Sequence, residues 1–380
     1  MTSSSGRPGI FVDARKAADF GIGRYITGLL FGLEALDVFD LTALVPCEAA
    51  GLLPESVRKV HSTSDHYTLG ELTAVRVAFS RSGAVLFHAP HYVVPFFPPD
   101  RTVVTIHDLM HLTRPEHASA AKRLYARTMI GRAVRSAARI LCVSSAAARQ
   151  LEAGFPAARD KTVVIPNGVD GRFLTEIPRQ RVEELRNSYD LPGSWVLFLG
   201  NDKPHKNLEG LLRAFAAARA RGGAAAKATL VLAGGAAERR AARERAVLDL
   251  GLSGAVLDLG VVPDLDVPPL IAGASTLVLP SLDEGFGLPV LEAQGLGTPV
   301  ICSNRGGLPE AAGNAALVVN PSPEAIAGAL GSLLEDGALR RDLAARGRAR
   351  AREFTWARAA GRTAAVYREV LAGSGTLETT

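Results

Sequence analysis

The chain has 380 residues, of which 47% are hydrophobic and 21% are charged. This composition excludes a disordered polymer and is enough for about two domains. The net charge of +5 is compatible with anionic ligands, but it does not by itself indicate nucleic-acid binding. The few cysteines, Cys47, Cys142 and Cys302, form neither a disulfide framework nor a metal-binding spacing. Because the chain shows no signal peptide and no long apolar run, we expect a cytoplasmic protein without a transmembrane helix.

Short β-branched runs alternate with longer helical patterns along the chain. Continuous apolar strands separated by helices predict parallel sheets covered on both faces, and two such series predict two doubly wound α/β domains. The first series of expected strands is Ile10–Asp13, Leu41–Val45, Val85–His88, Val103–Ile106, Ile140–Val143 and Val163–Ile165. The second series is Val196–Leu199, Thr229–Ala233, Val256–Leu259, Thr276–Leu279, Pro299–Cys302 and Ala316–Val319.

The join between the two series is a polar, proline-flanked stretch at 170–192, where the apolar strand pattern stops. We therefore expect an N-terminal domain at 1–175, a linker at 176–192 and a C-terminal domain at 193–355. An amphipathic helix at 356–372 follows, and the last residues are expected to be frayed.

The segment FGIGRY, Phe20–Tyr25, precedes a helical pattern near the N-terminus. Gly21 and Gly23 fit the start of a dinucleotide-binding fingerprint, but no third glycine follows at the required spacing, which disfavours a nicotinamide or flavin site. Two glycines at a helix start let the backbone approach a ligand closely. An ordinary tight turn is the alternative.

His107 follows the expected strand Val103–Ile106 and points to whatever lies above that edge of the sheet. His111 lies four residues later, which faintly resembles a zinc-binding helix. A zinc motif needs both histidines on a helix, whereas the residues before His107 favour a strand, so we expect no metal here. His107 is either a hydrogen-bond donor to a ligand or a structural histidine.

The segment GNDKPHKN, at 200–207, lies between a strand and a helix. Free backbone N–H groups and the positive end of a helix dipole favour a phosphate at such a place. Lys203 and Lys206 add full positive charge there. A capped surface loop with solvated lysines is the alternative.

Asp264 and Asp266 form a D-x-D pattern, as in metal-dependent sugar transferases. The pair is bracketed by prolines and leads into a helix. Both positions are therefore interpreted as turn and helix N-cap residues rather than metal ligands.

The stretch DEGFGLPVLEAQGLGTPV, Asp283–Val300, keeps two carboxylates in an apolar, glycine-rich setting. Pro289 suits the first turn of a helix and Gly297 suits its end, so we expect Glu284 in a loop and Glu292 in the first helical turn. Ionised carboxylates accept hydrogen bonds from hydroxyl groups, and the two therefore predict contacts to a sugar and a ribose, with a diphosphate at the helix N-terminus. Glu292 alone is also explained by the helix dipole.

Together these segments resemble the retaining glycosyltransferases of family 4. The most specific element is EGFGLPVLE, from Glu284 to Glu292, followed by GTPV and GGLPEAAG. Supporting elements are GIGRY, TIHDL, CVSSAA, IPNGVD, GNDKPHKN and FTWARAA. The resemblance covers nearly the whole chain. It implies the GT-B fold, with two Rossmann-like doubly wound domains facing across a cleft and a C-terminal helix that crosses back to pack on the N-terminal domain.

The resemblance also implies roles for individual residues. His107, Glu284 and Lys206 would be catalytic, with His107 and Glu284 beside the transferred sugar and Lys206 on the diphosphate. Glu292 would hold the ribose, and the segment containing Val261 and Val262 would lie along the nucleobase. The complete donor-binding set is Gly21, Gly23, Lys203, Lys206, Val261, Val262, Glu284, Gly285, Phe286, Gly287, Leu288 and Glu292. Many relatives carry an arginine at the position of Asn201, and Lys203 is the candidate replacement.

The implied reaction moves a hexose from a nucleoside-diphosphate sugar to a glycan, a lipid-linked intermediate or a small molecule. Family chemistry is described as front-face attack, in which the leaving diphosphate gathers charge and helps to deprotonate the acceptor. GDP-mannose is the first donor to test, because GIGRY and TIHDL are similar to segments of mannosyltransferases of polysaccharide assembly. No metal, other cofactor or nucleic-acid partner is expected. A sugar-nucleotide epimerase on the same architecture and a non-catalytic nucleotide-sugar-binding protein are the alternatives.

The stretch Ala120–Ile140 is basic and contains Leu124, Met129, Val134 and Ile140. Such a helix can lie on an anionic membrane surface, here at the inner membrane face. The alternative is a solvated helix whose apolar residues pack on the sheet.

Overall fold

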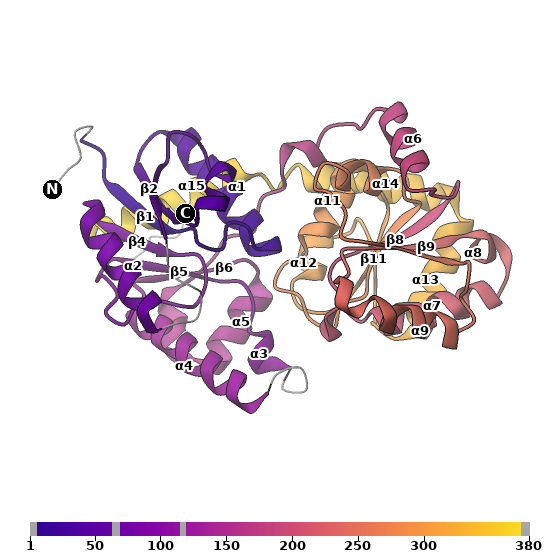
Figure 1. Cartoon of the computed structure of the whole chain (residues 1–380), viewed down its shortest axis with the longest axis horizontal. Helices are drawn as coiled ribbons and strands as arrows, with labels where there is room; N and C mark the ends of the chain where they lie inside the picture. The colour runs from indigo at the N-terminus through magenta and orange to yellow at the C-terminus, as the bar shows by residue number, and fades with distance from the viewer. Residues whose placement is uncertain (1–5, 63–68, 115–118, 374–380) are drawn as a thin grey trace. The chain divides into compact units, whose positions relative to one another are not determined.

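The chain folds into two compact units, as a computed structural model of residues 6–62, 69–114 and 119–373 shows (Figure 1). Unit 1 comprises Met1–Gly168 and Thr355–Thr380, and unit 2 comprises Val169–Phe354. The chain therefore leaves unit 1 once and returns to it with its last helix.

Unit 1 is built on a parallel sheet which, within the described residues, has seven strands in the order β3-β2-β1-β4-β5-β6-β7. The order reverses direction beside β1, as in doubly wound folds. The strands are β1 (Gly9–Asp13), β2 (Asp40–Val45), β3 (Arg58–His61), β4 (Leu86–Ala89), β5 (Thr102–Ile106), β6 (Arg139–Cys142) and β7 (Thr162–Val164).

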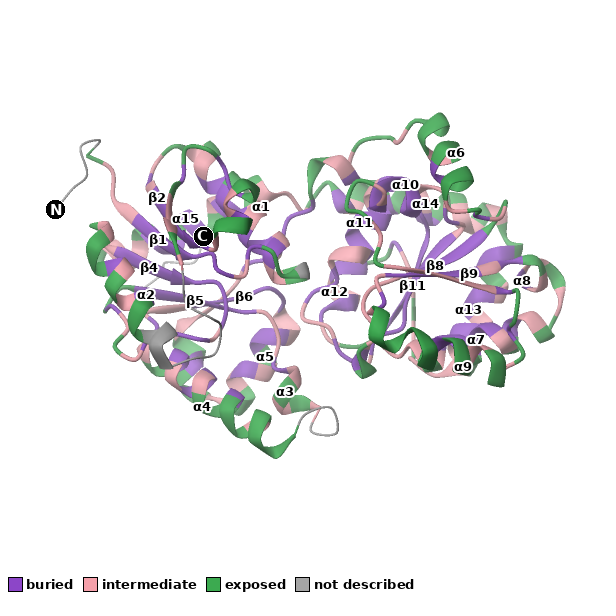
Figure 2. Ribbon diagram, viewed as in Figure 1, coloured by how far each residue is buried: buried purple, intermediate pink, exposed green. Residues whose placement is uncertain are grey.

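Helices cover both faces of the unit 1 sheet, which explains its nearly continuous apolar strands (Figure 2). One face packs against α2, α4 and α5 through a core that includes Phe11, Phe87 and Ile130. The C-terminal helix α15 lies beside α1, and its Tyr367 contacts His88 of β4. The helices are α1 (Phe20–Leu36), α2 (Leu69–Ser82), α3 (Met110–Thr113), α4 (Ala120–Ser136), α5 (Ser145–Gly154) and α15 (Trp356–Ala372), with 3₁₀ turns η1 (Cys47–Leu52) and η3 (Pro156–Lys161).

Unit 2 repeats the architecture with a second parallel sheet, whose strand order over the described residues is β10-β9-β8-β11-β12-β13. Its switch in direction lies between β8 and β11. The strands are β8 (Trp195–Leu199), β9 (Thr229–Ala233), β10 (Val256–Gly260), β11 (Thr276–Leu279), β12 (Val300–Ser303) and β13 (Leu317–Val319).

Helices α7, α8 and α13 bury one face of the unit 2 sheet, in a core that includes Phe198, Phe215 and Leu330. Trp195 donates to the Leu270 carbonyl of α10. The elements are η4 (Gly171–Phe173), α6 (Arg179–Ser188), η5 (Pro204–Lys206), α7 (Leu208–Ala220), α8 (Gly223–Lys227), η6 (Ala237–Arg239), α9 (Arg240–Asp249), α10 (Val267–Ala272), α11 (Leu288–Leu296), α12 (Leu308–Ala312), α13 (Pro323–Glu335) and α14 (Gly337–Ala351).

The prediction of two doubly wound α/β domains is confirmed. The expected strands of both series are present, with ends that differ by one residue at most. The strand that the sequence did not reveal is β3, whose residues RKVH are half-exposed at the edge of the sheet. An edge strand needs no continuous apolar run, because little of it is buried. Among the described residues, no helix is long and apolar enough to cross a bilayer.

The return of the chain to unit 1 depends on close packing between α15 and α1. Gly28 and Gly32 are one turn apart on α1 and face α15. A Cβ at Gly32 would lie 2.7 Å from the Trp356 carbonyl oxygen and 2.7 Å from the Ala360 Cβ. Because a backbone atom is involved, the helices would have to separate to admit a methyl group.

Replacement of Gly32 by alanine should therefore lower the free energy of unfolding by about 1–3 kcal/mol, the usual cost of overpacking a core. Urea unfolding followed by circular dichroism measures it. Gly361→Ala on α15 is the matched control, since no atom lies within 4 Å of its added Cβ. It should be neutral or stabilising by up to about 1 kcal/mol. Equal stabilities for the two variants would show that the glycines do not set the helix spacing.

Candidate active site

The residues singled out from the sequence lie on loops at the carboxyl ends of the parallel strands in both units. In unit 2 these are the loops after β8, β10 and β11. Such edges are where open α/β sheets bind their ligands. Each edge is described within its own unit.

Lys206 and Glu284, 78 residues apart in the sequence, meet at the edge of unit 2. The Lys206 Nζ donates to Glu284 Oε1 at 2.5 Å, and Ser281 Oγ donates to the same oxygen at 2.8 Å. The two charged side chains are only 16% and 13% exposed. An ion pair this sheltered is held by its hydrogen bonds as well as by charge.

Asn207 holds the Lys206 turn in place. Its backbone is left-handed, with φ of 57°, and its side-chain amide donates to the carbonyls of Pro280 at 3.1 Å and Pro321 at 2.9 Å. One side chain thus joins the loops after β8, β11 and β13. Sequence reasoning missed Asn207, because its partners are more than 70 residues away.

The loop that carries Glu284 rests on the glycine pair after β12. Gly306 has φ of +57°, and a Cβ there would lie 2.2 Å from the Glu284 carbonyl oxygen. The Gly307 N–H donates to that same carbonyl at 2.8 Å. A glycine is therefore required for both backbone conformation and space, and GGLP is a support for the carboxylate loop.

Glu292 lies on α11, the helix into which the Glu284 loop leads. The expectation that it occupies the first helical turn was wrong: α11 begins at Leu288, so Glu292 falls in the second turn. The helix starts one residue before Pro289, which makes Glu292 the fifth helical residue. Glu292 is 2% exposed, a depth that the helix dipole alone does not explain.

The residues between Glu284 and Glu292 have mixed environments. Phe286 is buried with its ring 5.9 Å from that of Phe354, so its side chain belongs to the core. Gly287 is the left-handed N-cap of α11, and Leu288 is the first helical residue. Gly285 is half-buried in the loop. Gly297 ends the helix in a left-handed conformation, as expected.

The other lysine of this edge is not part of the ion pair. Lys203 is exposed, and its backbone N–H donates to the Asn201 side-chain oxygen at 3.3 Å. Asn201 therefore caps the turn at the place where the resemblance implied an arginine. On the loop after β10, Val261 is 65% exposed and Val262 is half-buried.

The D-x-D aspartates bind arginines. Asp264 pairs with Arg172 through both oxygens, and Asp266 accepts from Arg181 at 2.7 Å and Tyr189 at 2.9 Å. Asp266 occupies the N-cap position of α10, but its side chain makes no cap hydrogen bond. The expected capping role was therefore wrong in detail. No group of three or more potential metal ligands occurs in the part of the chain that the structure describes.

In unit 1, His107 follows β5, as expected. Its Nε2 lies 2.9 Å from the Pro90 carbonyl, which only accepts, so this nitrogen carries the proton. Burial lowers the pKa of His107, so the ring is neutral near pH 7 and Nδ1 is an acceptor. The Nε2 hydrogen that was expected to bond a ligand therefore bonds the Pro90 carbonyl instead. His111 lies exposed on α3.

A buried hydrogen-bond chain runs from the C-terminal helix to Tyr25, whose ring packs against His107. Tyr367 of α15 bonds His88 Nδ1 at 2.6 Å, His88 Nε2 bonds Thr105 Oγ1 at 2.8 Å, and Thr105 bonds the Tyr25 hydroxyl at 2.8 Å. The Tyr25 ring meets the His107 ring edge-on at 4.8 Å. The tyrosine of GIGRY is therefore a support for His107, and sequence reasoning did not assign it.

The glycines of GIGRY differ from each other. Both lie in the first turn of α1. Gly21 is exposed with open space at its Cβ position. Gly23 is buried, and a Cβ there would lie 2.4 Å from the Ala17 carbonyl oxygen. The backbone at Gly23 therefore lies close to the protein's own chain, and this packing explains why a glycine is needed there.

Two further buried groups lie at the same edge of unit 1. Asp13 and Arg15 form a doubly hydrogen-bonded pair at 2.7 and 2.6 Å, and both are nearly inaccessible. Burial opposes ionisation, but the Arg15 charge and hydrogen bonds lower the pKa of Asp13 overall. His91 is also buried, and its Nδ1 accepts from the Val93 N–H at 3.0 Å.

Two parallel Rossmann-like units, with a shielded lysine–glutamate pair at one sheet edge, define a GT-B type of transferase. Two family models agree: Glycosyltransferase Family 4 matches residues 21–172, and Glycosyl transferases group 1 matches residues 183–350. The chain belongs to family 4 of the glycosyltransferases and is a retaining glycosyltransferase.

Relatives and solved structures agree with this assignment. The O-antigen chain mannosyltransferase B of Escherichia coli is 31% identical over 284 residues, which cover 74% of each chain. The D-inositol 3-phosphate glycosyltransferase of Acidothermus cellulolyticus is 32% identical over 348 residues, covering 87% of this chain and 72% of the relative. The sucrose-phosphate synthase of Thermosynechococcus elongatus shares the fold, with a TM-score of 0.80 at 21% identity over 97% of this chain and 100% of that structure.

The buried histidines predict loss of stability in mild acid. Burial lowers the pKa of His88 and of His91 from 6.5 to about 3. The unfolded chain therefore takes up protons below pH 6.5 while the fold does not, so stability is complete above that pH and is lost as the pH falls toward 3. Each histidine should cost about 1.4 kcal/mol per pH unit in this window.

Urea unfolding at pH 7.0 and 5.5 measures the loss, and His91→Gln should roughly halve the part due to this pair. His61→Gln is the control, because His61 is exposed at the sheet edge and its removal leaves the buried pair intact. An unchanged pH dependence in His91→Gln would contradict the assignment.

Proposed function

We propose that the protein transfers a hexose, with retention of configuration, from a nucleoside-diphosphate sugar to a glycan, lipid-linked or small-molecule acceptor. The observation that carries the proposal is the sheltered Lys206–Glu284 pair, with Ser281 on the same carboxylate oxygen. In this proposal Glu284 accepts from sugar hydroxyls and Lys206 binds the diphosphate, and the two groups are one hydrogen bond apart.

The pair has the chemistry that both ends of the donor require. The diphosphate binds the Lys206 ammonium in place of Glu284. A sugar hydroxyl then donates a hydrogen bond to Glu284 in place of the ammonium. Ser281 keeps the carboxylate in position during this exchange. As the glycosidic bond breaks, negative charge develops on the diphosphate, and the ammonium stabilises it where it forms. No covalent intermediate on Glu284 is needed.

The remaining donor contacts follow from the surrounding loops. Gly285 and the N-terminus of α11 offer backbone N–H groups to the phosphates. Buried Glu292 accepts from the ribose hydroxyls, and the exposed Val261 lies on the loop assigned to the nucleobase. In unit 1, we assign His107 to the reacting sugar, as a hydrogen-bond acceptor through Nδ1. Gly21 and Lys203 complete the proposed phosphate contacts, whereas Gly23 is buried against Ala17 and has a structural role.

GDP-mannose is the donor we propose. The support is the similarity to an O-antigen mannosyltransferase over 74% of the chain. The similarity to a D-inositol 3-phosphate glycosyltransferase supports a small-molecule acceptor as well as a glycan. Neither a metal nor another cofactor is part of the proposal.

Glu284→Gln should lower kcat/KM for the donor by about 10- to 100-fold, since a hydrogen bond to a charged group is worth about 1.5–3 kcal/mol. The donor is first found by thermal shift against a panel of nucleotide sugars, because a ligand that binds only the folded chain raises the midpoint. Turnover is then measured with mannosyl acceptors, and product configuration by NMR.

Glu183→Gln is the matched control for this prediction, because Glu183 is an exposed glutamate of α6 paired with Arg179. It should keep the wild-type rate. Equal rates for Glu284→Gln and wild type would exclude the assigned site. An epimerised donor in the NMR spectrum, formed without an acceptor, would favour the isomerase alternative. Binding with no turnover under any acceptor would favour the non-catalytic alternative.

We also propose that α4 binds an anionic membrane surface. Leu124 and Tyr125 are 68% and 40% exposed near its N-terminal end, beside the basic residues Lys122, Arg123 and Arg127. The exposed surface is shorter than the stretch Ala120–Ile140 expected from the sequence, since Val134 packs in the core and Ile140 lies in β6. The exposed large apolar side chains of α4, Leu124 and Tyr125, therefore lie in its first half beside these basic residues, where each cation near an anionic surface adds about 1 kcal/mol.

The protein should float with vesicles containing anionic lipid and remain at the bottom with zwitterionic ones. Leu124→Glu should reduce flotation several-fold, because it removes apolar contact and adds like charge to the membrane. Leu248→Glu is the control, since Leu248 is 62% exposed on a charged helix of unit 2. Equal flotation of both variants would contradict a surface on α4.

A further inference from the structure

Arg243 is a buried cation that neither the sequence nor the proposed donor contacts account for. It lies on α9 and is 5% exposed. Burying a guanidinium is costly unless its donors are bonded and its charge is paired. Its partners therefore indicate what it does.

The guanidinium bonds to residues that lie in, or directly after, three neighbouring strands. Its Nη1 donates to Asp202 Oδ2 at 2.7 Å and to the Ala236 carbonyl at 2.9 Å, and its Nε donates to Asp258 Oδ2 at 2.8 Å. Asp202 follows β8, Ala236 follows β9 and Asp258 lies in β10. One side chain thus connects three adjacent carboxyl ends of the sheet.

The backbone around Arg243 is shaped to admit it. A Cβ at Gly235 would lie 2.6 Å from the guanidinium carbon. Asp258 also accepts from the Gly260 N–H at 3.0 Å, at the irregularity where β10 ends. Gly260 in turn accepts from the Gly234 N–H at 2.6 Å. Asp258 therefore connects Arg243 to the turn that precedes Val261, because it bonds both the guanidinium and the Gly260 N–H.

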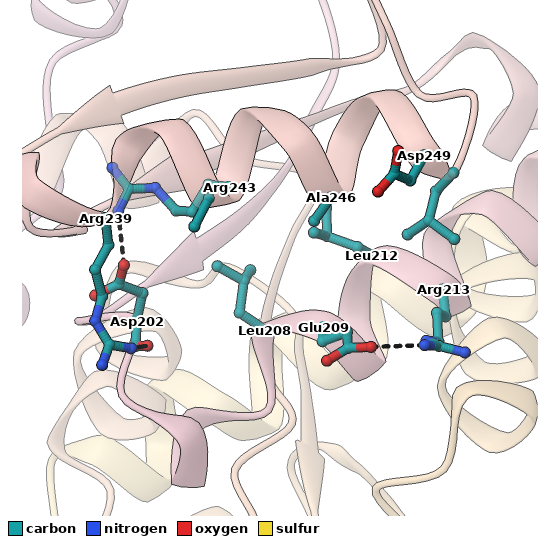
Figure 3. A pocket seen from close by; sticks show the side chains of 11 residues that line it. Asp202, Leu208, Glu209, Leu212, Arg213, Arg239, Arg243, Ala246 and Asp249 are labelled. Atoms are coloured by element: carbon teal, nitrogen blue, oxygen red, sulfur yellow. Dashed lines mark hydrogen bonds and ion pairs between the residues drawn. The ribbon is translucent and has the colours of Figure 1, made fainter.

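Apolar packing does not fix α9 by itself. A cavity of about 340 Å³ lies between α9 and α7, lined by Leu208, Leu212, Ala246 and Leu250 among others (Figure 3). Asp202 lies at one end of it between Arg239 and Arg243, and Arg239 donates to the Asp202 carbonyl at 2.9 Å. Ala246, Val247 and Leu250 still pack against the unit 2 core, and these polar contacts add a directional hold on α9 at this end of the cavity.

We propose that Arg243 is a positioning residue for donor binding, which fixes the lysine-bearing loop at 200–207 relative to the nucleobase segment at 260–263. The proposal rests on the proposed function, because it takes these two segments as the phosphate and base contacts. Arg243 itself touches no donor atom. Its fork of donors holds two carboxylates at a set spacing, which a lysine cannot reproduce because it has a single donor nitrogen.

The first test needs no ligand. Hydrogen exchange is compared for wild type, Arg243→Lys and Arg243→Met, without added nucleotide. Peptides covering 200–203 and 258–261 should exchange at least about 10-fold faster in both variants, while the strand at 276–279 should keep its protection. Arg245→Met is the matched control, since Arg245 is on the same helix and pairs with Asp249 at the surface. Unchanged exchange at both segments in Arg243→Met would overturn the proposal.

The second test uses calorimetric titration with the nucleoside diphosphate of the donor found in the panel. Arg243→Lys and Arg243→Met should weaken its binding by about 10-fold or more, whereas Arg245→Met should bind as wild type. KM for the sugar donor should rise in parallel, with kcat changed less than 3-fold. A lower fraction of folded protein would reduce apparent kcat and leave KM unchanged, so that pattern would overturn the positioning role in favour of a purely structural one.

A final arm restores the lost group. Arg243→Ala removes the side chain to Cβ, and added methylguanidinium should recover at least part of the diphosphate affinity, while methylammonium should not. Equal recovery by both cations would overturn the need for a fork of donors. If the wild-type protein binds no nucleotide in the panel, the proposed function itself is wrong. If the wild-type protein binds a nucleotide and the Arg243 variants bind it equally well, only the positioning role of Arg243 is wrong.

Discussion

The charges of Lys206 and Glu284 at the carboxyl edge of the unit 2 sheet must be paired, because both side chains are largely sheltered from water. Parallel strands all end on the same side of a sheet, so loops distant in sequence meet there. Lys206 and Glu284 satisfy each other in this way, and Ser281 adds a neutral donor. Removing either charge from such a pair leaves the other one poorly solvated. The loops that carry the pair must therefore be held accurately, and much of the surrounding structure serves that end.

The supports are polar and come from remote elements. In unit 2, Asn207 ties three loops together, and the chain at Gly306 lies directly beneath the carboxylate loop. In unit 1 a remote helix also supports a loop residue through polar contacts, since the hydrogen-bond chain from Tyr367 ends at Tyr25 beside His107. Each support is a buried polar group whose bonds are directional. Apolar packing positions whole helices, whereas these groups determine where individual loop atoms lie.

The strands could be predicted from the sequence because buried parallel strands consist of local apolar runs. β3 was not predicted, because an edge strand need not be apolar. The sequence also identified Lys206 and Glu284, since a charge in a glycine-rich loop stands out locally. It did not assign His88, Asn207 or Arg243, because each looks ordinary in its own segment and gains its role from partners far along the chain. Glu292 was expected in the first helical turn but lies just beyond it, because a proline in the first turn does not fix the residue at which the helix starts.

The sheltered pair also bears on how a charged donor can be bound at this edge. A lone buried carboxylate would repel a diphosphate, and a lone buried ammonium would be costly to keep dry. Paired, they are close to neutral as a unit and need little rearrangement to accept a ligand that offers both an anion and hydroxyl groups. In the function proposed above, a phosphate replaces the carboxylate at Lys206 and a sugar hydroxyl replaces the ammonium at Glu284, so each charge changes partner without being left unpaired. Under this proposal a nucleotide sugar satisfies both charges with one molecule, whereas a free sugar or a free phosphate satisfies only one.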